Sequence, residues 1–461
     1  MLRKIYHKSP EPVKKIIRKV HSKIPFPYVY GLEFAKYYKW LMKTQWLPPE
    51  ELEELQNKRL QIIIKHAYEN VPYYRRIFDE RDLKPEDIQT KEDLKLLPIL
   101  TKDDVRKHFN ELIAKNADKY RPYLFESGGT TGKPLKFYKD RISSIIHSAV
   151  VWRYRNWAGY EYGKRWVVMR YETFVDSDQK IPYRVEGNTM FLSSFHLKYE
   201  NVSDYLSIIE KFNPEAIWAF PSTLYIMAKY IDKQGGKFNF NLKAIFTSSE
   251  TLFEHHRKLI EKAFSCKIYD WYGSNEGVVS AAECPEGNYH VTEEGIIEIV
   301  DFKNNICSVG EKGKVVGTSL WNYAMPLIRY ELGDIASLSN KKCKCGRGLP
   351  LLDSVEGRID DIIVTKDGRL VGRLDEAFHY SFGIRESQII QHEIGKIIVK
   401  IVRDVTFSNK DIEILDKELK KRLGNDMQIS YEFVDEIPKT RRGKYRFVIS
   451  KVIKEYLENM E

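Results

Sequence analysis

The sequence has few of the features that mark exported or membrane-spanning proteins. It contains five cysteines in 461 residues, and these are too unevenly spread to suggest a disulfide framework. No run of apolar residues is long enough to cross a bilayer, and the first residues lack the apolar core of a secretory signal. These absences predict a protein that acts in the cytoplasm.

The net charge of +10 is concentrated in one short segment. Residues 1–30 contain eight Lys or Arg residues and one acidic residue, which gives that segment a net charge of +7. Apolar residues alternate with the basic ones at helical spacing after Pro12, which predicts a short basic amphipathic helix. This helix either packs on its own domain or lies, through residues 1–25, on the inner face of an anionic membrane. No recognisable nucleic-acid-binding module accompanies the charge, so we expect no nucleic-acid partner.

The length of the chain suggests at least two domains. Charged helical patterns, interrupted at Pro72 and Pro98, predict a mainly helical lead-in within residues 1–120. From about residue 121 to 320, short strand-like runs alternate with longer amphipathic segments. This alternation is typical of an α/β sheet with helices on its faces, in which ligands gather at the strand ends.

Beyond Gly357 the pattern changes to that of a small α+β unit. It contains an alternating strand at 396–402, an amphipathic helix at 411–423 and a second strand at 429–434. We therefore expect an α/β fold with two parts. They are a large N-terminal domain, residues 1–358, and a small mobile C-terminal domain, residues 359–461.

The most informative motif is a glycine-rich loop, Ser127-Gly128-Gly129-Thr130-Thr131-Gly132-Lys133-Pro134. Its backbone N–H groups and hydroxyls can surround anionic oxygens, and its lysine adds a positive charge. It is not a Walker loop, because Ser127 replaces a required glycine and Pro134 replaces a required Ser or Thr. The loop predicts a phosphate-binding flap between strands, with a glycine-rich turn that binds nothing as the alternative.

Three later motifs add groups suited to a nucleotide. Tyr272 and Glu276 follow a predicted strand, where an aromatic ring can stack on a base and a carboxylate can hold a metal. Asp334 is an acceptor-only group that suits two ribose hydroxyls, although an Asp that caps a turn would look the same. Lys444 lies on a basic loop that is either a surface turn or a lid over an anionic site.

Taken in chain order, these motifs resemble those of the adenylate-forming (AMP-binding) enzyme superfamily. Within it, the chain resembles the phenylacetate-CoA ligase family, and most of all its members found among capsule and exopolysaccharide genes. The likeness covers nearly the whole chain. It rests on the glycine loop, the Tyr272–Gly277 and Arg329–Asp334 segments, Gly357-Arg358-Ile359-Asp360-Asp361 and Gly443-Lys444, together with His66–Tyr74, Leu97–Lys102 and Phe220-Pro221-Ser222.

The resemblance implies an ATP-dependent ligase. It would convert a carboxylic acid to an acyl-adenylate with release of pyrophosphate, and then transfer the acyl group to CoA. Lys444 and Glu276 would be catalytic, with Lys444 bridging the substrate carboxylate and the α-phosphate and Glu276 binding Mg²⁺. The expected partners are therefore a small carboxylic acid and ATP, and a homodimer is a further expectation.

The resemblance also implies roles for a larger set of residues. Thr130, Thr131 and Lys133 would hold the β- and γ-phosphates, Tyr272 would border the adenine, and Asp334 and Arg358 would bind the ribose. The remaining ATP-binding residues would be Ser127, Gly128, Gly129, Gly132, Ser249, Glu250, Gly273 and Ser274. Asp360, or alternatively Asp361, would be the hinge of the small domain. The acid pocket would include Phe195, His196, Phe220, Ser222 and Ser248.

One departure from the family pattern bears on the acceptor. The family usually has a glycine-asparagine turn tied to CoA positioning, where this chain has Thr365-Lys366-Asp367-Gly368-Arg369-Leu370. Two alternatives to CoA ligation therefore stay open. One is amide or ester transfer to a polysaccharide-related acceptor, such as an amino sugar, and the other is a non-catalytic nucleotide-binding scaffold. Joint retention of the charged motif residues argues against the scaffold.

Four residues are suited to a structural zinc site. Cys284 and His290 form one short segment, and Cys343 and Cys345 form another, so that three sulfurs and one nitrogen could surround the metal tetrahedrally. Relatives in the family show a similar pairing. The alternative is a set of scattered reduced cysteines, which is how Cys266 and Cys307 are interpreted.

Overall fold

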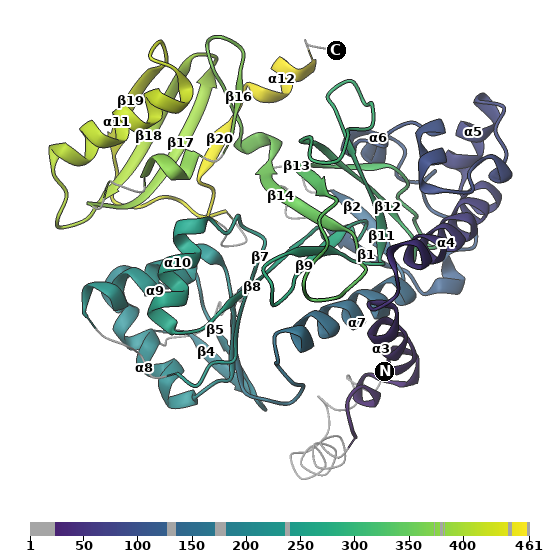
Figure 1. Cartoon of the computed structure of the whole chain (residues 1–461), viewed down its shortest axis with the longest axis horizontal. Coiled ribbons are helices and arrows are strands. Elements are labelled where there is room, and N and C mark those ends of the chain that lie inside the picture. The colour runs from purple at the N-terminus through teal and green to yellow at the C-terminus, as the bar shows by residue number, and fades with distance from the viewer. Residues whose placement is uncertain are drawn as a thin grey trace.

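The structure is a computed structural model of the chain (Figure 1). It describes residues 24–126, 135–170, 181–235, 240–372, 374–378, 381, 383–440 and 445–458. Most of the predicted basic helix, the whole glycine-rich loop and Lys444 lie outside the described residues.

The first part of the described chain is helical, as predicted. Pro49 and Pro72 occupy first helical positions, where a missing N–H costs nothing, and the Thr101 hydroxyl caps a helix by accepting a hydrogen bond from the Asp104 N–H at 3.1 Å. Within the described residues, none of the helices combines the length and apolar character needed to cross a bilayer. The helices, with η for 3-10, are η1 Tyr28–Tyr30, α3 Leu32–Thr44, α4 Pro49–Asn70, α5 Pro72–Glu80, η2 Pro85–Asp87, η3 Lys91–Leu96, α6 Lys102–Lys107 and η4 Ala117–Tyr120.

A twelve-stranded mixed sheet forms the centre of the large domain. Its strand order is β11-β12-β13-β14-β10-β9-β8-β7-β6-β3-β5-β4. Strands β5, β3, β6, β7 and β8 run parallel, and the remaining pairs are antiparallel. The strands are β3 Trp166–Met169, β4 Tyr183–Glu186, β5 Thr189–Leu192, β6 Ala216–Ala219, β7 Ala244–Ser248, β8 Ile268–Gly273, β9 Ser280–Glu283, β10 Tyr289–Val291, β11 Gly295–Val300, β12 Gly313–Ser319, β13 Tyr330–Ser339 and β14 Leu351–Arg358.

Helices cover both faces of the parallel half of this sheet, which confirms the predicted α/β class. The helices α8 (Val202–Phe212), α9 (Pro221–Lys233) and α10 (Glu254–Phe264) cover one face, and α7 (Arg141–Trp157) lies on the other (Figure 1). Successive side chains of a strand point to opposite faces. Accordingly Ile245 of β7 belongs to the core under α8–α10, whereas Phe246 packs against Tyr154 of α7.

A two-stranded hairpin brackets the glycine-rich loop. Strands β1 (Tyr123–Glu126) and β2 (Lys136–Lys139) are antiparallel, with Glu126 opposite Lys136. Residues 127–134, which lie outside the described residues, stand between these two strands in the chain, and their role as a flap stays a prediction.

The C-terminal part is the small α+β unit expected from the sequence. Its four-stranded sheet has the order β19-β18-β17-β20, and Leu415, Leu419 and Leu423 of α11 pack on it. It lies against α9 and α10 of the large domain (Figure 1), where Lys229 Nζ donates to the Ile384 carbonyl oxygen at 2.8 Å. Its elements are η6 Ile359–Asp361, β15 Ile363–Val364, β16 Leu370–Val371, η7 Leu374–Phe378, β17 Ile384–Glu393, β18 Lys396–Arg403, α11 Asn409–Leu423, β19 Gln428–Phe433, β20 Val448–Ser450 and α12 Ile453–Glu458.

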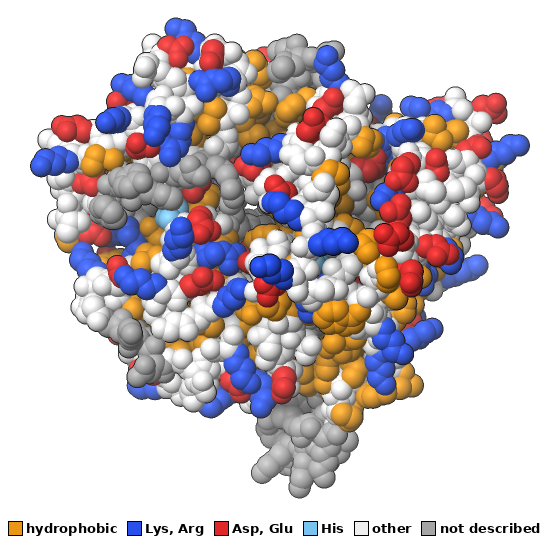
Figure 2. Space-filling model, in the orientation of Figure 1, with side chains coloured by type: hydrophobic (Ala, Val, Ile, Leu, Met, Phe, Trp, Pro, Cys, Tyr) orange, Lys and Arg blue, Asp and Glu red, His pale blue; other side chains and the backbone are white. Residues whose placement is uncertain are grey.

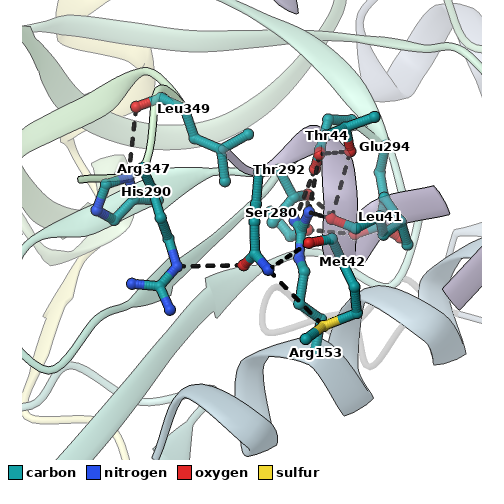
Figure 3. A network of polar contacts seen from close by, with 12 residues as sticks. Leu41, Met42, Thr44, Arg153, Ser280, His290, Thr292, Glu294, Arg347 and Leu349 are labelled. Atoms are coloured by element: carbon teal, nitrogen blue, oxygen red, sulfur yellow. Dashed lines mark hydrogen bonds and ion pairs between the residues drawn. The ribbon is translucent and has the colours of Figure 1, made fainter. Parts of the chain in front are cut away.

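A buried ion pair joins the helical lead-in to the sheet. Arg153 of α7 is fully buried, and its guanidinium donates to both carboxylate oxygens of Glu293 at 2.8 and 2.6 Å. The same guanidinium donates to the Leu41 carbonyl oxygen at 3.1 Å, and the Thr44 hydroxyl donates to Glu293 at 2.9 Å. Figure 3 shows how these contacts gather α3, α7 and the sheet around one point. The pair therefore fixes the lead-in to the domain that carries the strand ends.

We expect Arg153→Met to lower the free energy of unfolding of the large domain by about 3–5 kcal/mol, because it leaves the Glu293 carboxylate buried without its cation. Urea denaturation measures this change. The matched control is Lys58→Met, which breaks an exposed pair with Glu54 on α4 and should leave the unfolding midpoint unchanged. Equal midpoints for Arg153→Met and the wild type would contradict the prediction.

Candidate active site

The candidate site lies where the parallel strands end. Strands β3, β6, β7 and β8 end side by side at Met169, Ala219, Ser248 and Gly273. Ligands of α/β sheets bind at the carboxyl ends of such strands. The predicted residues at this edge are Phe220 and Ser222 after β6, Ser248, Ser249 and Glu250 at the end of β7, and Tyr272, Gly273, Ser274 and Glu276 at the end of β8.

Three of the predicted nucleotide-binding residues contact one another. The Tyr272 hydroxyl donates to Asp334 Oδ2 at 3.0 Å, and Arg358 Nε lies 3.9 Å from Asp334 Oδ1. Asp334 on β13 and Arg358 on β14 are paired in register, so the two strands hold the ion pair in place. Burial, with the adjacent Asp334 carboxylate, raises the pKa of Tyr272 well above its ordinary value and keeps the hydroxyl a donor. An acceptor-only carboxylate is thus held at one end of the site.

Glu276 is buried beside a tyrosine and a lysine. The Tyr330 hydroxyl donates to Glu276 Oε1 at 3.3 Å, and Tyr330 is fully buried. Lys139 of β2 is buried as well, and burial lowers its pKa while the carboxylates of Glu294 and Glu276 oppose that shift. Lys139 therefore brings a cation from the end of the glycine-loop hairpin to the predicted magnesium ligand.

The irregular part of β13 just before Asp334 requires glycine. Gly333 has φ +82, and a Cβ there would lie 3.2 Å from Lys102 Nζ and 3.5 Å from an Arg358 guanidinium nitrogen. Lys102, which begins α6, donates to the Leu332 carbonyl oxygen at 2.7 Å. The helical lead-in thus supplies a cation that packs against the part of β13 that carries Asp334.

A strained turn follows β7. Ser249 has φ +74, a left-handed conformation that is unfavourable for a non-glycine residue, and its hydroxyl accepts a hydrogen bond from Arg170 at 2.5 Å. The Arg170 guanidinium, just after β3, lies over the rings of Trp218 and Phe220 at 4.4 and 5.0 Å. Backbone strain of this kind is concentrated at ligand sites.

The predicted acid-pocket residues are less closely grouped. Phe220 and Ser248 are buried at the strand ends, and the Ser222 N–H donates to Glu250. Phe195 and His196 follow β5 instead, and exposed His196 pairs through Nδ1 with the Ser193 hydroxyl at 2.8 Å. The structure brings Phe220, Ser222 and Ser248 to the strand ends, whereas the described hydrogen bond of the His196 side chain is to its neighbour Ser193.

The four predicted zinc ligands form a compact cluster. The ligand atoms of Cys284, His290, Cys343 and Cys345 all lie within 4.8 Å of one another. Cys284 Sγ lies 3.6 Å from Cys343 Sγ, and Cys345 Sγ lies 3.2 Å from His290 Nε2. Thiolates around a tetrahedral zinc are separated by about 3.8 Å, since each Zn–S bond is about 2.3 Å. The donor set and its spacing therefore fit zinc.

Comparisons with known proteins bear on both domains. Residues 363–451 match the family model described as the CapK C-terminal domain. Over 469 residues the chain is 28% identical to Protein CapK of Staphylococcus aureus, covering 98% of this chain and 100% of that protein. It is 24% identical over 436 residues to a phenylacetate-coenzyme A ligase of Thermus thermophilus, covering 87% and 97%.

A solved structure decides the fold. It is a 2-hydroxyisobutyryl-CoA ligase in the postadenylation state in complex with R3-HIB-AMP, and it aligns with a TM-score of 0.71 at 19% identity over 95% of this chain and 97% of that one. The chain has the fold of the adenylate-forming CoA ligases. The predicted resemblance to the phenylacetate-CoA ligase family and the prediction of a ligase-class enzyme are confirmed.

Several predicted residues of this adenylate-forming fold lie outside the described residues. They are Ser127, Gly128, Gly129, Thr130, Thr131, Gly132 and Lys133 of the glycine loop, and Lys444. The side chain of Asp360 is likewise not described, whereas the alternative hinge residue Asp361 accepts a hydrogen bond from Arg446 at 3.1 Å. Their roles stay predictions.

Sequence reasoning missed three cations of the site: Lys102, Lys139 and Arg170. Lys139 ends a short strand in which two aromatic residues lie between two lysines, and nothing in that pattern distinguishes the buried lysine from the exposed one. Lys102 lies in the Leu97–Lys102 segment, and the family resemblance of that segment assigns no role to the lysine. Arg170 ends the apolar run of β3, and an arginine directly after a predicted parallel strand was a usable signal.

Proposed function

We propose that the chain activates a carboxylic acid with ATP and transfers the acyl group, with CoA as the first-choice acceptor. A carboxylate oxygen of the acid would attack the α-phosphorus, and the bond to the bridging oxygen of pyrophosphate would break. A thiol would then attack the acyl carbon and release AMP. The observation that carries the proposal is the grouping of Tyr272, Asp334 and Arg358 at the strand ends of an adenylate-forming fold.

The described residues divide the work between nucleotide and phosphate. The Asp334 carboxylate would accept the ribose hydroxyls, with Arg358 and Tyr272 fixing its orientation. Glu276 would hold Mg²⁺, which supplies charge neutralisation at the phosphates, and Lys139 beside it would favour the same anions. By the family resemblance, Thr130, Thr131 and Lys133 would hold the outer phosphates and Lys444 would contact the reacting carboxylate.

One observation favours a different acceptor. The segment 365–370, which replaces the family's glycine-asparagine turn, is closed by its own contacts: the Arg369 N–H donates to the Thr365 hydroxyl at 2.9 Å. The Arg369 side chain also donates to the carbonyl oxygens of Arg422 and Leu423 at the end of α11. These contacts leave the segment tied to its own domain, which favours the alternative of transfer to an amine or hydroxyl of a polysaccharide-related acceptor. A non-catalytic scaffold would have no use for the late lysine.

We expect acid-dependent ATP-pyrophosphate exchange with at least one member of a panel of aryl, fatty, hydroxy and amino acids. Lys444→Ala should abolish the exchange, a loss of several kcal/mol of transition-state stabilisation, and leave ATP binding nearly unchanged. Lys451→Ala, which removes an exposed lysine of the same domain, is the control and should exchange normally.

Two results would contradict these expectations. Exchange with none of the acids would revive the scaffold, and a Lys444→Ala protein that exchanges at the wild-type rate would refute the role of the lysine. Trials with CoA and with amino sugars, using the acid found in this way, would then decide the acceptor.

We also propose that Cys284, His290, Cys343 and Cys345 hold one structural zinc. Metal analysis should give about one zinc per chain, and Cys345→Ser should lower both the zinc content and the unfolding temperature. Cys307→Ser, which changes a cysteine outside the cluster, is the control. Zinc far below one equivalent, with no loss of stability on chelation, would exclude the site.

We further propose a cytoplasmic site of action with peripheral contact to the inner face of a membrane through residues 1–25. The exposed face of α3, which comes soon after this segment in the chain, supports the proposal, because Leu32 is 80% exposed and is followed at helical spacing by exposed Lys36, Lys39 and Lys43. Exposed Tyr28 and Tyr30 adjoin this face, and Figure 2 shows hydrophobic side chains gathered over this part of the molecule. Apolar and basic groups together suit an anionic lipid surface.

Each lysine near an anionic surface contributes about 1 kcal/mol, so changing Lys36, Lys39 and Lys43 to Glu should weaken binding to phosphatidylglycerol vesicles by at least roughly tenfold. The control changes three exposed lysines of α11, Lys410, Lys417 and Lys421, to Glu and should bind as the wild type does. Equal loss in both variants, or equal binding to phosphatidylcholine vesicles, would exclude this surface. The homodimer stays a prediction.

A further inference from the structure

Glu250 bridges the two domains through backbone hydrogen bonds. Its Oε2 accepts from the Ser222 N–H at 3.1 Å, and its Oε1 accepts from the Tyr445 N–H at 2.7 Å. Ser222 is the second residue of α9, whose N-terminal amides favour an anion, whereas Tyr445 belongs to the small domain. One carboxylate therefore ties the end of β7 and the start of α9 to the small domain.

The small-domain segment that Glu250 holds is itself well anchored. The Tyr445 hydroxyl contacts both backbone groups of Ser387 on β17, and Gln388 Nε2 donates to the Arg446 carbonyl oxygen at 2.8 Å. The ring of Phe447 packs between Phe378 of the small domain and Phe253 of the large domain, at 5.2 and 5.5 Å. Tyr445 is thus anchored within the small domain, so the hydrogen bond from its N–H to Glu250 connects the small domain as a unit to the large domain.

A second contact lies on the other side of the basic loop. Lys439 Nζ donates to the Ser194 carbonyl oxygen, after β5, at 3.3 Å. Lys439 is half-buried and faces the carboxylates of Glu386, Glu250 and Glu436. Lys439 and Tyr445, which lie on the two sides of the basic loop, are therefore both hydrogen-bonded to groups at the strand ends of the large domain.

The covalent chain links this arrangement to the predicted catalytic lysine. Lys444 precedes Tyr445, and consecutive Cα atoms are about 3.8 Å apart across a trans peptide. The position of the Tyr445 backbone therefore limits where the Lys444 backbone can lie. We propose that Glu250 is a positioning residue for acyl-adenylate formation, because it holds the Tyr445 amide and so keeps the small domain docked on the strand ends. This inference rests on the proposed function.

The test compares Glu250→Gln with Glu436→Gln. Both residues are carboxylates that face Lys439, but Glu436 is exposed and belongs to the small domain itself. Loss of one charge-assisted hydrogen bond should slow acid-dependent pyrophosphate exchange by roughly ten- to a hundredfold in Glu250→Gln. Transfer of acyl groups from a preformed acyl-adenylate should change by less than about twofold, because that step does not use the docked lysine. The dissociation constant of ATP separates the positioning role from the ATP contact that the family resemblance implies for Glu250, because a positioning residue should change it by less than about twofold. Glu250→Asp, which keeps the charge on a shorter side chain, should lie between the wild type and Glu250→Gln.

Hydrogen–deuterium exchange supplies a readout independent of activity. The peptide that contains the Tyr445 amide should exchange faster in Glu250→Gln than in the wild type and the Glu436→Gln control. An unchanged rate of pyrophosphate exchange, an equal loss in both half-reactions, or weaker ATP binding would overturn the positioning role. If the wild type activates no acid, the proposed function fails. The contrast at the Tyr445 amide then decides the role of Glu250 in docking alone: faster exchange supports it and equal exchange overturns it.

Discussion

The candidate site depends on the junction between β8 and β9, where the parallel half of the sheet meets the antiparallel half. β8 runs parallel to β7 and delivers Tyr272 to the common edge of strand ends. The antiparallel strands β13 and β14 return toward the same edge and deliver Asp334 and Arg358 in register. Neither half of the sheet could form the Tyr272–Asp334 contact alone. The mixed sheet is therefore the constraint that assembles groups separated by many residues in the chain.

The order of the elements was predictable because it rests on local patterns. A few consecutive residues are enough to show the pattern of apolar residues in the buried strand β7, in the alternating strand β18 and in the amphipathic helix α11. Asp334 was also predictable as a site residue, since an Asp after Gly in that motif has recognisable chemistry. The buried setting of Lys139 was not, because the carboxylates near it, Glu276 and Glu294, lie in turns that are far from it in the chain. Long-range partners of this kind leave no trace in a local pattern.

The Cys/His cluster adds a second long-range constraint on the same sheet. His290 Nδ1 contacts the Leu349 carbonyl oxygen at 3.3 Å, and the neighbouring Arg347 donates to Gln45 at the end of α3 at 3.2 Å (Figure 3). The Trp157 indole donates to the same Gln45 oxygen at 2.7 Å. The cluster is thus connected through one amide side chain to both α3 and α7. A metal held there would stiffen the loops before β10 and β14, and β14 ends at Arg358.

Several polar contacts join the two domains. Their groups are hydrogen-bonded to protein when the domains are docked and would be hydrogen-bonded to water if the domains separated. The Tyr445 N–H, the Glu250 carboxylate and Lys439 Nζ can exchange these partners for water, so the net cost of separating each is on the order of 1–3 kcal/mol rather than its full strength. Apolar contacts across the interface include the ring pair of Phe253 with Phe447 and a small cluster near the domain boundary, in which Ile335 packs with Ile362, Val364 and Ile453. A large apolar interface would hold the small domain in one position, whereas directional hydrogen bonds to backbone groups define a position without making it permanent. The polar part of the interface would therefore suit the proposed role of the small domain, which requires accurate docking for one chemical step.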